Sequence, residues 1–245
     1  MSNYEAIELE LEEIKPGAIY QVSHDFGPET ISIRGTTFVR FMNKFYVRES
    51  TQKLDEAEVI ALCRARSELE TVGPINQSVK NIITKFVNRL SPLSILEIGS
   101  GTQPALKSGT SFKQYTLSDA DPKTVAQNKK QGRECVKFGK DDKLPYPEEH
   151  FDIAIAVFVF HFKIYDSQIT ELYRCLKLTG ALIANVYLLT ENERKDLALD
   201  LEKQGFNVIR INDPSTSCKN NEYWICCRSS MILAKMQDAL LEILN

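Results

Sequence analysis

The sequence predicts an α/β fold in which a doubly wound, seven-stranded, mostly parallel sheet follows a small N-terminal module of strands and helix. After Pro92, buried apolar segments alternate with amphipathic ones, as in βαβ units covered on both faces. Before residue 90, short β segments are separated by Gly, Pro or Asn turns. The chain has 245 residues and 43% hydrophobic residues, enough for a large α/β domain with an appendage. We place the boundary between residues 1–75, the β-rich module with helix, and residues 76–245.

The N-terminal module is predicted to begin with strands and to end with helix. Its β segments include the alternating Ile7, Leu9 and Leu11, followed by 18–22, 30–33, 38–41 and 45–47. Two helical stretches follow, and the second repeats apolar residues at helical spacing and stops before Pro92. They cover 55–71 and 76–90.

The rest of the chain supplies the seven strands. The strands are predicted at 93–98, 115–118, 134–138, 151–158, 181–188, 207–211 and 222–227. Helices are predicted at 122–131, 167–178, 191–204 and 231–244. Between the first two strands, Gly, Ser and Thr crowd a short interval, which favours a turn and a loop over a full helix.

Composition narrows the class of protein. Thirty Lys and Arg against 33 Asp and Glu give a net charge of -3, so nucleic acid is an unlikely partner. The longest apolar run, 151–162, is too short for a membrane span. The N-terminus lacks the pattern of a secretory signal, and six cysteines without Cys-x-x-Cys spacing suit a reducing compartment. We therefore expect a cytoplasmic protein that neither enters a membrane nor holds a metal.

Two features of the sequence indicate a ligand-binding site. A buried strand beginning at Ser94 runs into a glycine-rich turn at Gly99 and Gly101, where backbone N–H groups can approach a ligand closely. Glu97 lies in that strand, and Asp119 follows the next one, where a doubly wound sheet binds a ribose diol. Together they indicate a nucleoside-containing cofactor.

Residues 93 to about 229 resemble the class I S-adenosylmethionine-dependent methyltransferases of the small-domain superfamily, which have a Rossmann-like sheet. Glu97, Gly99 and Gly101 match the family's first motif, and Asp119 matches its ribose-binding acid. The segments that resemble its later motifs are Lys143–Ile153, before the fourth strand, and Tyr173–Leu182, before the fifth.

The resemblance implies a methyltransferase (EC 2.1.1.-) that uses S-adenosyl-L-methionine. The implied cofactor-binding residues are Glu97, Gly99, Ser100, Gly101, Asp119, Ala120, Asp141 and Phe158. The sequence departs from the family in lacking a third glycine, and Lys140 stands where an acid often contacts adenine, with Asp141 one position later. These departures keep open a non-catalytic binding or scaffold subunit of the same fold. A nicotinamide dehydrogenase is disfavoured because its fingerprint's last glycine is missing.

His161 is the candidate catalytic residue. It lies just past the carboxyl end of the fourth predicted strand, where open α/β sheets bind ligands. The alternative is a histidine buried for packing reasons in an apolar neighbourhood. The methyl acceptor, a small molecule or a protein, is not identified by the sequence. We expect that a protein partner or a second copy of the chain, if either binds, does so through the N-terminal module.

Overall fold

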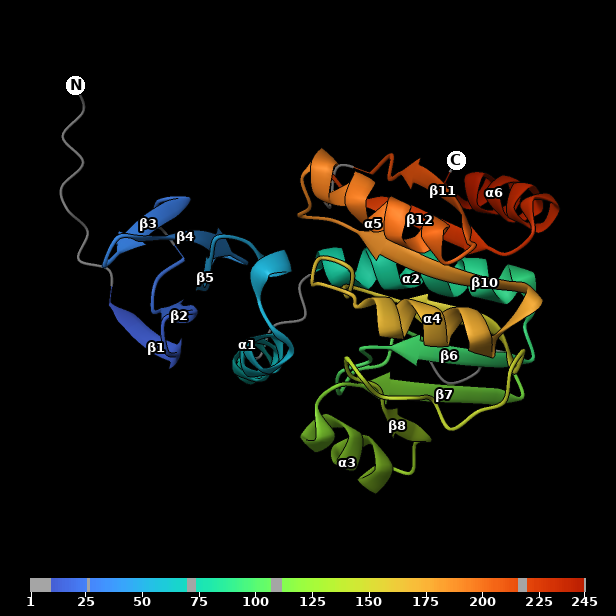
Figure 1. Cartoon of the computed structure of the whole chain (residues 1–245), viewed down its shortest axis with the longest axis horizontal. Coiled ribbons are helices and arrows are strands. Elements are labelled where there is room, and N and C mark those ends of the chain that lie inside the picture. The colour runs from blue at the N-terminus through green and yellow to red at the C-terminus, as the bar shows by residue number, and fades with distance from the viewer. Residues whose placement is uncertain (1–9, 26, 70–73, 107–111, 216–219, 245) are drawn as a thin grey trace. The chain divides into compact units, whose positions relative to one another are not determined.

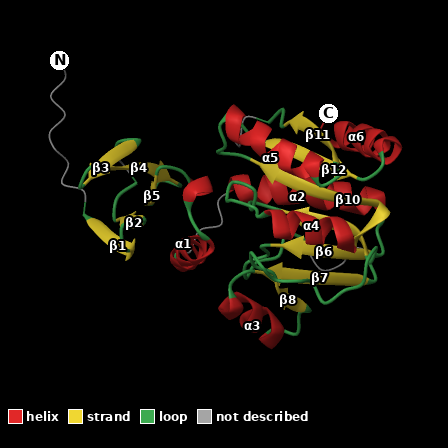
Figure 2. Ribbon diagram, in the orientation of Figure 1, coloured by secondary structure: helices red, strands yellow, loops and turns green. Residues whose placement is uncertain are grey.

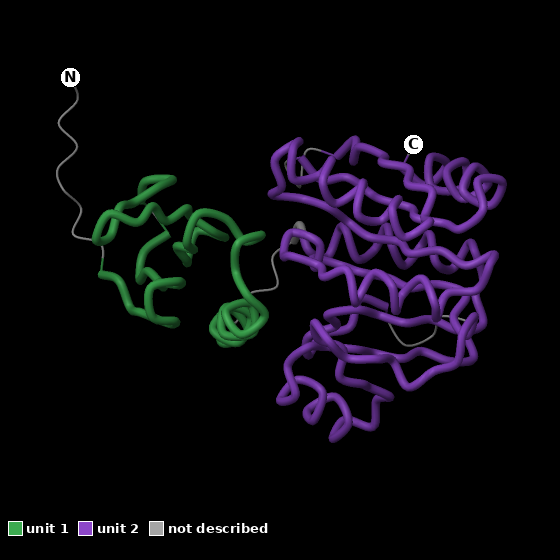
Figure 3. The backbone as a smooth tube through the Cα atoms, in the orientation of Figure 1, with its two compact units in different colours: residues 1–71 green, residues 72–245 purple. Residues whose placement is uncertain are grey.

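A computed structural model describes the chain except for residues 1–9, 26, 70–73, 107–111, 216–219 and 245. The chain divides into two compact units, Met1–Thr71 and Val72–Asn245 (Figure 3).

The N-terminal unit is an antiparallel sheet followed by helix. Its strands are β1 (Leu11–Lys15), β2 (Ile19–Val22), β3 (Thr30–Ile33), β4 (Thr36–Phe41) and β5 (Phe45–Arg48), in the order β1-β2-β5-β4-β3. A short 3-10 turn, η1 (Thr51–Lys53), leads to α1 (Glu56–Glu68), which begins at a capping box between Asp55 and Glu58. The β-rich character predicted for this region is confirmed, while Ile7 and Leu9 of the first predicted strand lie outside the described residues.

The C-terminal unit contains the seven-stranded sheet that the sequence predicts (Figures 1 and 2). The strands are β6 (Ser94–Ile98), β7 (Gln114–Asp119), β8 (Cys135–Lys137), β9 (Phe151–Ala156), β10 (Leu176–Val186), β11 (Asn207–Asn212) and β12 (Glu222–Cys227). Their order is β11-β12-β10-β9-β6-β7-β8, and β12 runs antiparallel to both of its neighbours.

Helices cover both faces of this sheet. They are α2 (Pro74–Leu90), α3 (Pro122–Lys130), α4 (Asp166–Cys175), α5 (Glu191–Lys203) and α6 (Ser230–Leu244). One apolar cluster joins α2 and α6 to the sheet, and another joins α4 and α5 to the opposite face. Cys227 belongs to the first cluster and Cys226 to the second, because successive residues of a strand point to opposite faces.

Three predicted carboxyl ends in the C-terminal unit are wrong by two residues or more. Helix α4 ends at Cys175, not at 178, because Leu176 already pairs with Phe151 as the first residue of β10. Strand β9 ends at Ala156 and β10 at Val186, each two residues earlier than predicted. Phe158 and Leu188 have φ of 60° and 61°, a left-handed conformation that a strand cannot contain.

Candidate functional site

The candidate residues gather where parallel strands end. Strands β6, β7 and β9 are neighbours and parallel, so their carboxyl ends lie at one edge of the sheet. The chain passes from β6 to β7 on one side and returns to β9 on the other. Such a topological switch point is where open α/β sheets bind ligands. Gly99, Asp119 and Phe158 follow or end these three strands.

The two glycines after β6 have different surroundings. We call residues 99–103 the glycine loop; Gly99 and Gly101 in it have φ of 59° and 57°. A Cβ atom added to Gly99 would lie 2.7 Å from Cγ2 of Val159, whereas one added to Gly101 would meet nothing within 4 Å. Gly99 is therefore required for packing against the segment after β9, while Gly101 leaves open space beside its backbone.

Asp119 connects the end of β7 to the glycine loop. Its Oδ2 accepts a hydrogen bond from the Gly101 N–H at 2.9 Å, and its Oδ1 accepts one from the Asp121 N–H at 2.9 Å. Burial raises the pKa of Asp119, and these two hydrogen bonds oppose the rise. Since a carboxylate offers about four acceptor positions, Asp119 retains capacity for hydroxyl donors.

Glu97 is buried in β6, with 3% of its surface exposed. Both of its carboxylate oxygens accept from the Ala105 N–H, at 3.0 and 3.1 Å, and Oε2 also accepts from the Tyr115 hydroxyl. Burial raises the pKa of Glu97 to about 7, although these hydrogen bonds favour the ionised form. In this structure Glu97 anchors the chain after the glycine loop, and its contact with a cofactor stays a prediction.

Two residues that hold the glycine loop are not among the site residues predicted from the sequence. Asn128, fully buried in α3, donates to the Gly101 carbonyl at 2.8 Å. Arg133 donates to the Thr102 carbonyl at 3.0 Å and to Oδ1 of Asn128 at 2.9 Å. The available signal was an asparagine in the middle of a predicted helix, an unfavourable position unless its side chain has a specific partner.

Asp141 follows β8, and the end of that strand lies beside Asp119, whose carbonyl accepts from the Phe138 N–H at 3.0 Å. Asp141 is exposed in the turn after β8, where the next residue, Asp142, accepts from the Gly139 N–H at 2.7 Å. Lys140 places its Nζ 5.2 Å from the centre of the Tyr165 ring. Among the described residues, Asp141 makes no hydrogen bond with the other predicted cofactor residues, so its role stays a prediction. Ser100, by contrast, belongs to the glycine loop, and Ala120 directly follows Asp119.

His161 is enclosed by aromatic rings. It is fully buried, and its ring centre lies 4.0 Å from that of Phe162 and 4.7 Å from that of Tyr187. Phe158 also packs edge-on against Tyr187 at 5.3 Å. A methyl acceptor would contact His161 only if this cluster opened, so the predicted catalytic role stays a prediction.

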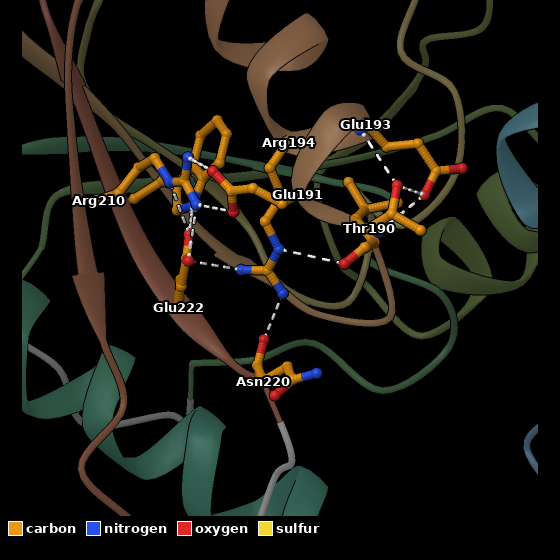
Figure 4. A network of polar contacts seen from close by, with 9 residues as sticks. Thr190, Glu191, Glu193, Arg194, Arg210, Asn220 and Glu222 are labelled. Carbon is orange, nitrogen blue, oxygen red and sulfur yellow. Dashed lines mark hydrogen bonds and ion pairs between the residues drawn. The ribbon is translucent and has the colours of Figure 1, made fainter.

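An ion-pair network lies farther along the same sheet edge (Figure 4). Glu222, opposite Val186 and Asn212 in the sheet, accepts from Arg210 at 2.9 Å and lies 2.8 Å from Nη1 of Arg194. Burial alone would raise the pKa of Glu222, but hydrogen bonds from Arg210 and Trp224 hold it below its ordinary value. No pattern in the sequence predicts this network, because its residues come from three separate elements, α5, β11 and β12.

The comparisons agree with the fold and the motifs. Residues 96–184 match the sequence model of a family described as "Methyltransferase domain". No curated protein sequence matches the chain. None of the helices in the described part of the chain is long and apolar enough to cross a membrane.

Three solved structures are similar to this chain. The CMeT domain of the citrinin polyketide synthase has 14% identity and a TM-score of 0.52, covering 71% of this chain and 57% of its own. The CurJ carbon methyltransferase has 13% identity and a TM-score of 0.51, covering 71% and 59%. A TehB-like methyltransferase from Corynebacterium glutamicum has 12% identity and a TM-score of 0.50, covering 71% and 97%. The chain thus spans less than two thirds of the first two proteins.

The seven-stranded sheet with its antiparallel β12 has the fold of class I S-adenosylmethionine-dependent methyltransferases. Residues 96–184, which match the sequence model of the methyltransferase domain, carry the glycine loop and Asp119.

Proposed function

We propose that the protein transfers the methyl group of S-adenosyl-L-methionine to a small molecule or a protein and releases S-adenosylhomocysteine. The observation that carries the proposal is the 2.9 Å hydrogen bond from the Gly101 N–H to Asp119. It joins a glycine loop to a carboxylate at the switch point of the sheet, where a nucleoside would lie. The match of residues 96–184 to the sequence model of the methyltransferase domain supports methyl transfer as the reaction.

The residues present fit such a cofactor. Open space beside Gly101 allows a ligand to approach the loop backbone, and Asp119 has acceptor capacity for ribose hydroxyls. When bound, S-adenosyl-L-methionine would supply an activated methyl group on its sulfonium. In the proposal, Gly99, Ser100 and Gly101 form the loop that contacts it, Asp119 and Ala120 border the ribose, and Glu97, Asp141 and Phe158 complete the site. An in-line displacement can proceed largely by positioning, so these residues need not include a strong base.

The acceptor side is proposed to lie beyond β9, near His161, since ligands approach this edge of the sheet. His161→Ala should leave affinity for S-adenosylhomocysteine nearly unchanged and lower turnover once an acceptor is known; unchanged turnover would make His161 a packing residue. The proposal includes a cytoplasmic location, and a partner protein or second copy bound through the N-terminal unit.

The test is calorimetric titration of the full chain with S-adenosylhomocysteine and, separately, with NAD. Gly101→Val should abolish binding, because its side chain would fill the open space beside the loop. Gly35→Val is the matched control: Gly35 also has positive φ and open surroundings, but it lies in the N-terminal unit. Circular dichroism checks that each variant is folded.

Selective binding of S-adenosylhomocysteine that Gly101→Val loses and Gly35→Val keeps would support the proposal and justify a search for the acceptor with labelled methyl donor. A folded wild-type protein that does not bind S-adenosylhomocysteine would refute it. Binding without transfer to any acceptor tested would favour the non-catalytic subunit of the same fold.

A further inference from the structure

We propose that Asn185 is a positioning residue of the candidate site, which holds the left-handed turn at Phe158 through a directional series of hydrogen bonds that starts at Asp213. The inference rests on the proposed function, because it assigns a task at the same edge of the sheet. It adds three residues, Asn185, Asn221 and Asp213, that no sequence motif indicates.

The turn at Phe158 needs support. Phe158 has φ of 60°, a left-handed conformation that is unfavourable for a residue with a side chain. Its N–H donates to Oδ1 of Asn185 at 2.7 Å, and both residues are buried. Because Asn185 lies in β10, next to β9, it fixes the chain where it leaves β9 and leads to Val159 and His161.

The orientation of the Asn185 side chain is set by its neighbours. Nδ2 of Asn185 donates to Oδ1 of Asn221 at 3.2 Å, and Nδ2 of Asn221 donates to Oδ2 of Asp213 at 2.9 Å. An ionised carboxylate only accepts hydrogen bonds, so Asp213 requires the amide nitrogen of Asn221 on its side. Asn221 then presents its oxygen to Asn185, and Asn185 must present its own oxygen to Phe158. The series therefore has one direction, from the carboxylate to the backbone donor.

The far end of this series is fixed by the ion-pair network. Asn220 and Asn221 directly precede β12, which begins at Glu222. Arg194 donates to the Asn220 carbonyl and also forms an ion pair with Glu222 (Figure 4). Asp213 additionally accepts from the Ser215 N–H at 2.9 Å. Asn221 is thus held from both sides along the backbone. The buried side-chain amide of Asn221 therefore has little freedom to rotate by 180° and exchange its oxygen and nitrogen.

The segment that the turn directs contacts the glycine loop. Cγ2 of Val159 occupies the place that a Cβ on Gly99 would need, 2.7 Å away, so the first residue after Phe158 packs directly against the loop. A change in the Phe158 turn would therefore shift Val159 relative to Gly99. This contact is the physical route by which Asn185, which does not touch the glycine loop in the described contacts, would influence cofactor binding.

The test measures the turn and the site separately. Asn185→Leu keeps the approximate volume and removes the acceptor; we expect amide exchange at Phe158, followed by NMR on protein labelled at phenylalanine, to accelerate about tenfold or more. Affinity for S-adenosylhomocysteine, measured by calorimetry, should fall about tenfold, the effect of a buried donor left without its acceptor. Asp213→Ala should also accelerate amide exchange at Phe158 and lower the affinity for S-adenosylhomocysteine, each by a smaller factor than Asn185→Leu, although Asp213 does not touch Phe158. Asp213→Asn, whose amide oxygen can still accept from Asn221, should show the exchange rate and the affinity of the wild-type protein.

Ser94→Ala is the control for general loss of stability. Ser94 is buried at the opposite end of β6, where its hydroxyl is hydrogen-bonded to Asp152. We expect it to destabilise the protein without altering exchange at Phe158 relative to neighbouring amides, and without altering affinity.

The possible results separate the two proposals. A wild-type protein that does not bind S-adenosylhomocysteine overturns the proposed function and this inference with it. Wild-type binding that Asn185→Leu retains in full, or exchange at Phe158 that responds equally to Ser94→Ala, overturns the inference alone. Loss of protection and of affinity in Asn185→Leu and Asp213→Ala, with recovery in Asp213→Asn, supports it.

Discussion

Alanine at Gly99 should destabilise the C-terminal unit more than alanine at Gly101, although the two backbones have nearly the same conformation. Left-handed φ costs a non-glycine residue about 1–2 kcal/mol, and this cost applies to both positions. At Gly99 the new Cβ would also lie 2.7 Å from Cγ2 of Val159, well inside carbon–carbon contact distance. Displacing Val159 adds about 1–3 kcal/mol, as overpacking does. The expected losses are therefore about 2–5 kcal/mol for Gly99→Ala and about 1–2 kcal/mol for Gly101→Ala.

The assay is urea unfolding followed by tryptophan fluorescence. The chain has one tryptophan, Trp224, which is fully buried in β12, so the signal reports on the C-terminal unit. In a Val159→Ala background the colliding methyl group is absent, and Gly99→Ala should then cost no more than Gly101→Ala. This is a double-mutant cycle on one contact. Equal losses for the two glycine variants in the wild-type background, or a Gly99→Ala loss that Val159→Ala leaves unchanged, would refute the reasoning.

Three further predictions concern charged groups. Burial raises the pKa of Glu97 from its ordinary value of 4.5 to about 7, so the folded state holds more protons than the unfolded state between these values. The free energy of unfolding should therefore fall by up to about 3 kcal/mol as pH rises through that window, and Glu97→Gln should lack this slope in urea titrations. Asp119→Ala should weaken S-adenosylhomocysteine binding by about 1.5–3 kcal/mol in calorimetry, and unchanged affinity would remove Asp119 from the site. Arg194→Met should destabilise the C-terminal unit by about 3 kcal/mol in unfolding followed by circular dichroism, because Glu222 loses a buried partner; a loss below about 1 kcal/mol would show that Arg210 suffices.

The parts of the fold that were predictable are those with local signals. Strand β6 is a run of buried residues from Ser94 to Ile98 that ends in glycine, so both its identity and its end can be read from the sequence. Helix α3 begins where Asp121 precedes Pro122, and Asp121 caps it by accepting from the Lys123 N–H at 2.9 Å. The cofactor motifs share this property, since each is a few residues at the end of one strand.

The errors arise where distant residues decide the backbone. Leu176 continues the helical pattern of α4, but it becomes a strand residue because it pairs with Phe151, 25 positions earlier. Nothing near Phe158 in the sequence signals its left-handed conformation, because the acceptor of its N–H is Asn185. Asn128, which holds the Gly101 carbonyl, was assigned to a helix without a role for the same reason.

The carboxylates proposed to bind the cofactor also accept hydrogen bonds from the protein backbone, and this affects how their variants must be interpreted. Glu97 accepts from the Ala105 N–H, and Asp119 accepts from the N–H groups of Gly101 and Asp121. Removing either carboxylate leaves buried or half-buried donors without their acceptors, a cost that falls on the apo protein as well as on the complex. A loss of cofactor affinity in such a variant thus combines a missing contact with a displaced glycine loop. Gly101→Val leaves both carboxylates in place and adds its atoms to open space, and the cost of its left-handed φ is matched by the control Gly35→Val. It is therefore the sharper probe of where the ligand lies.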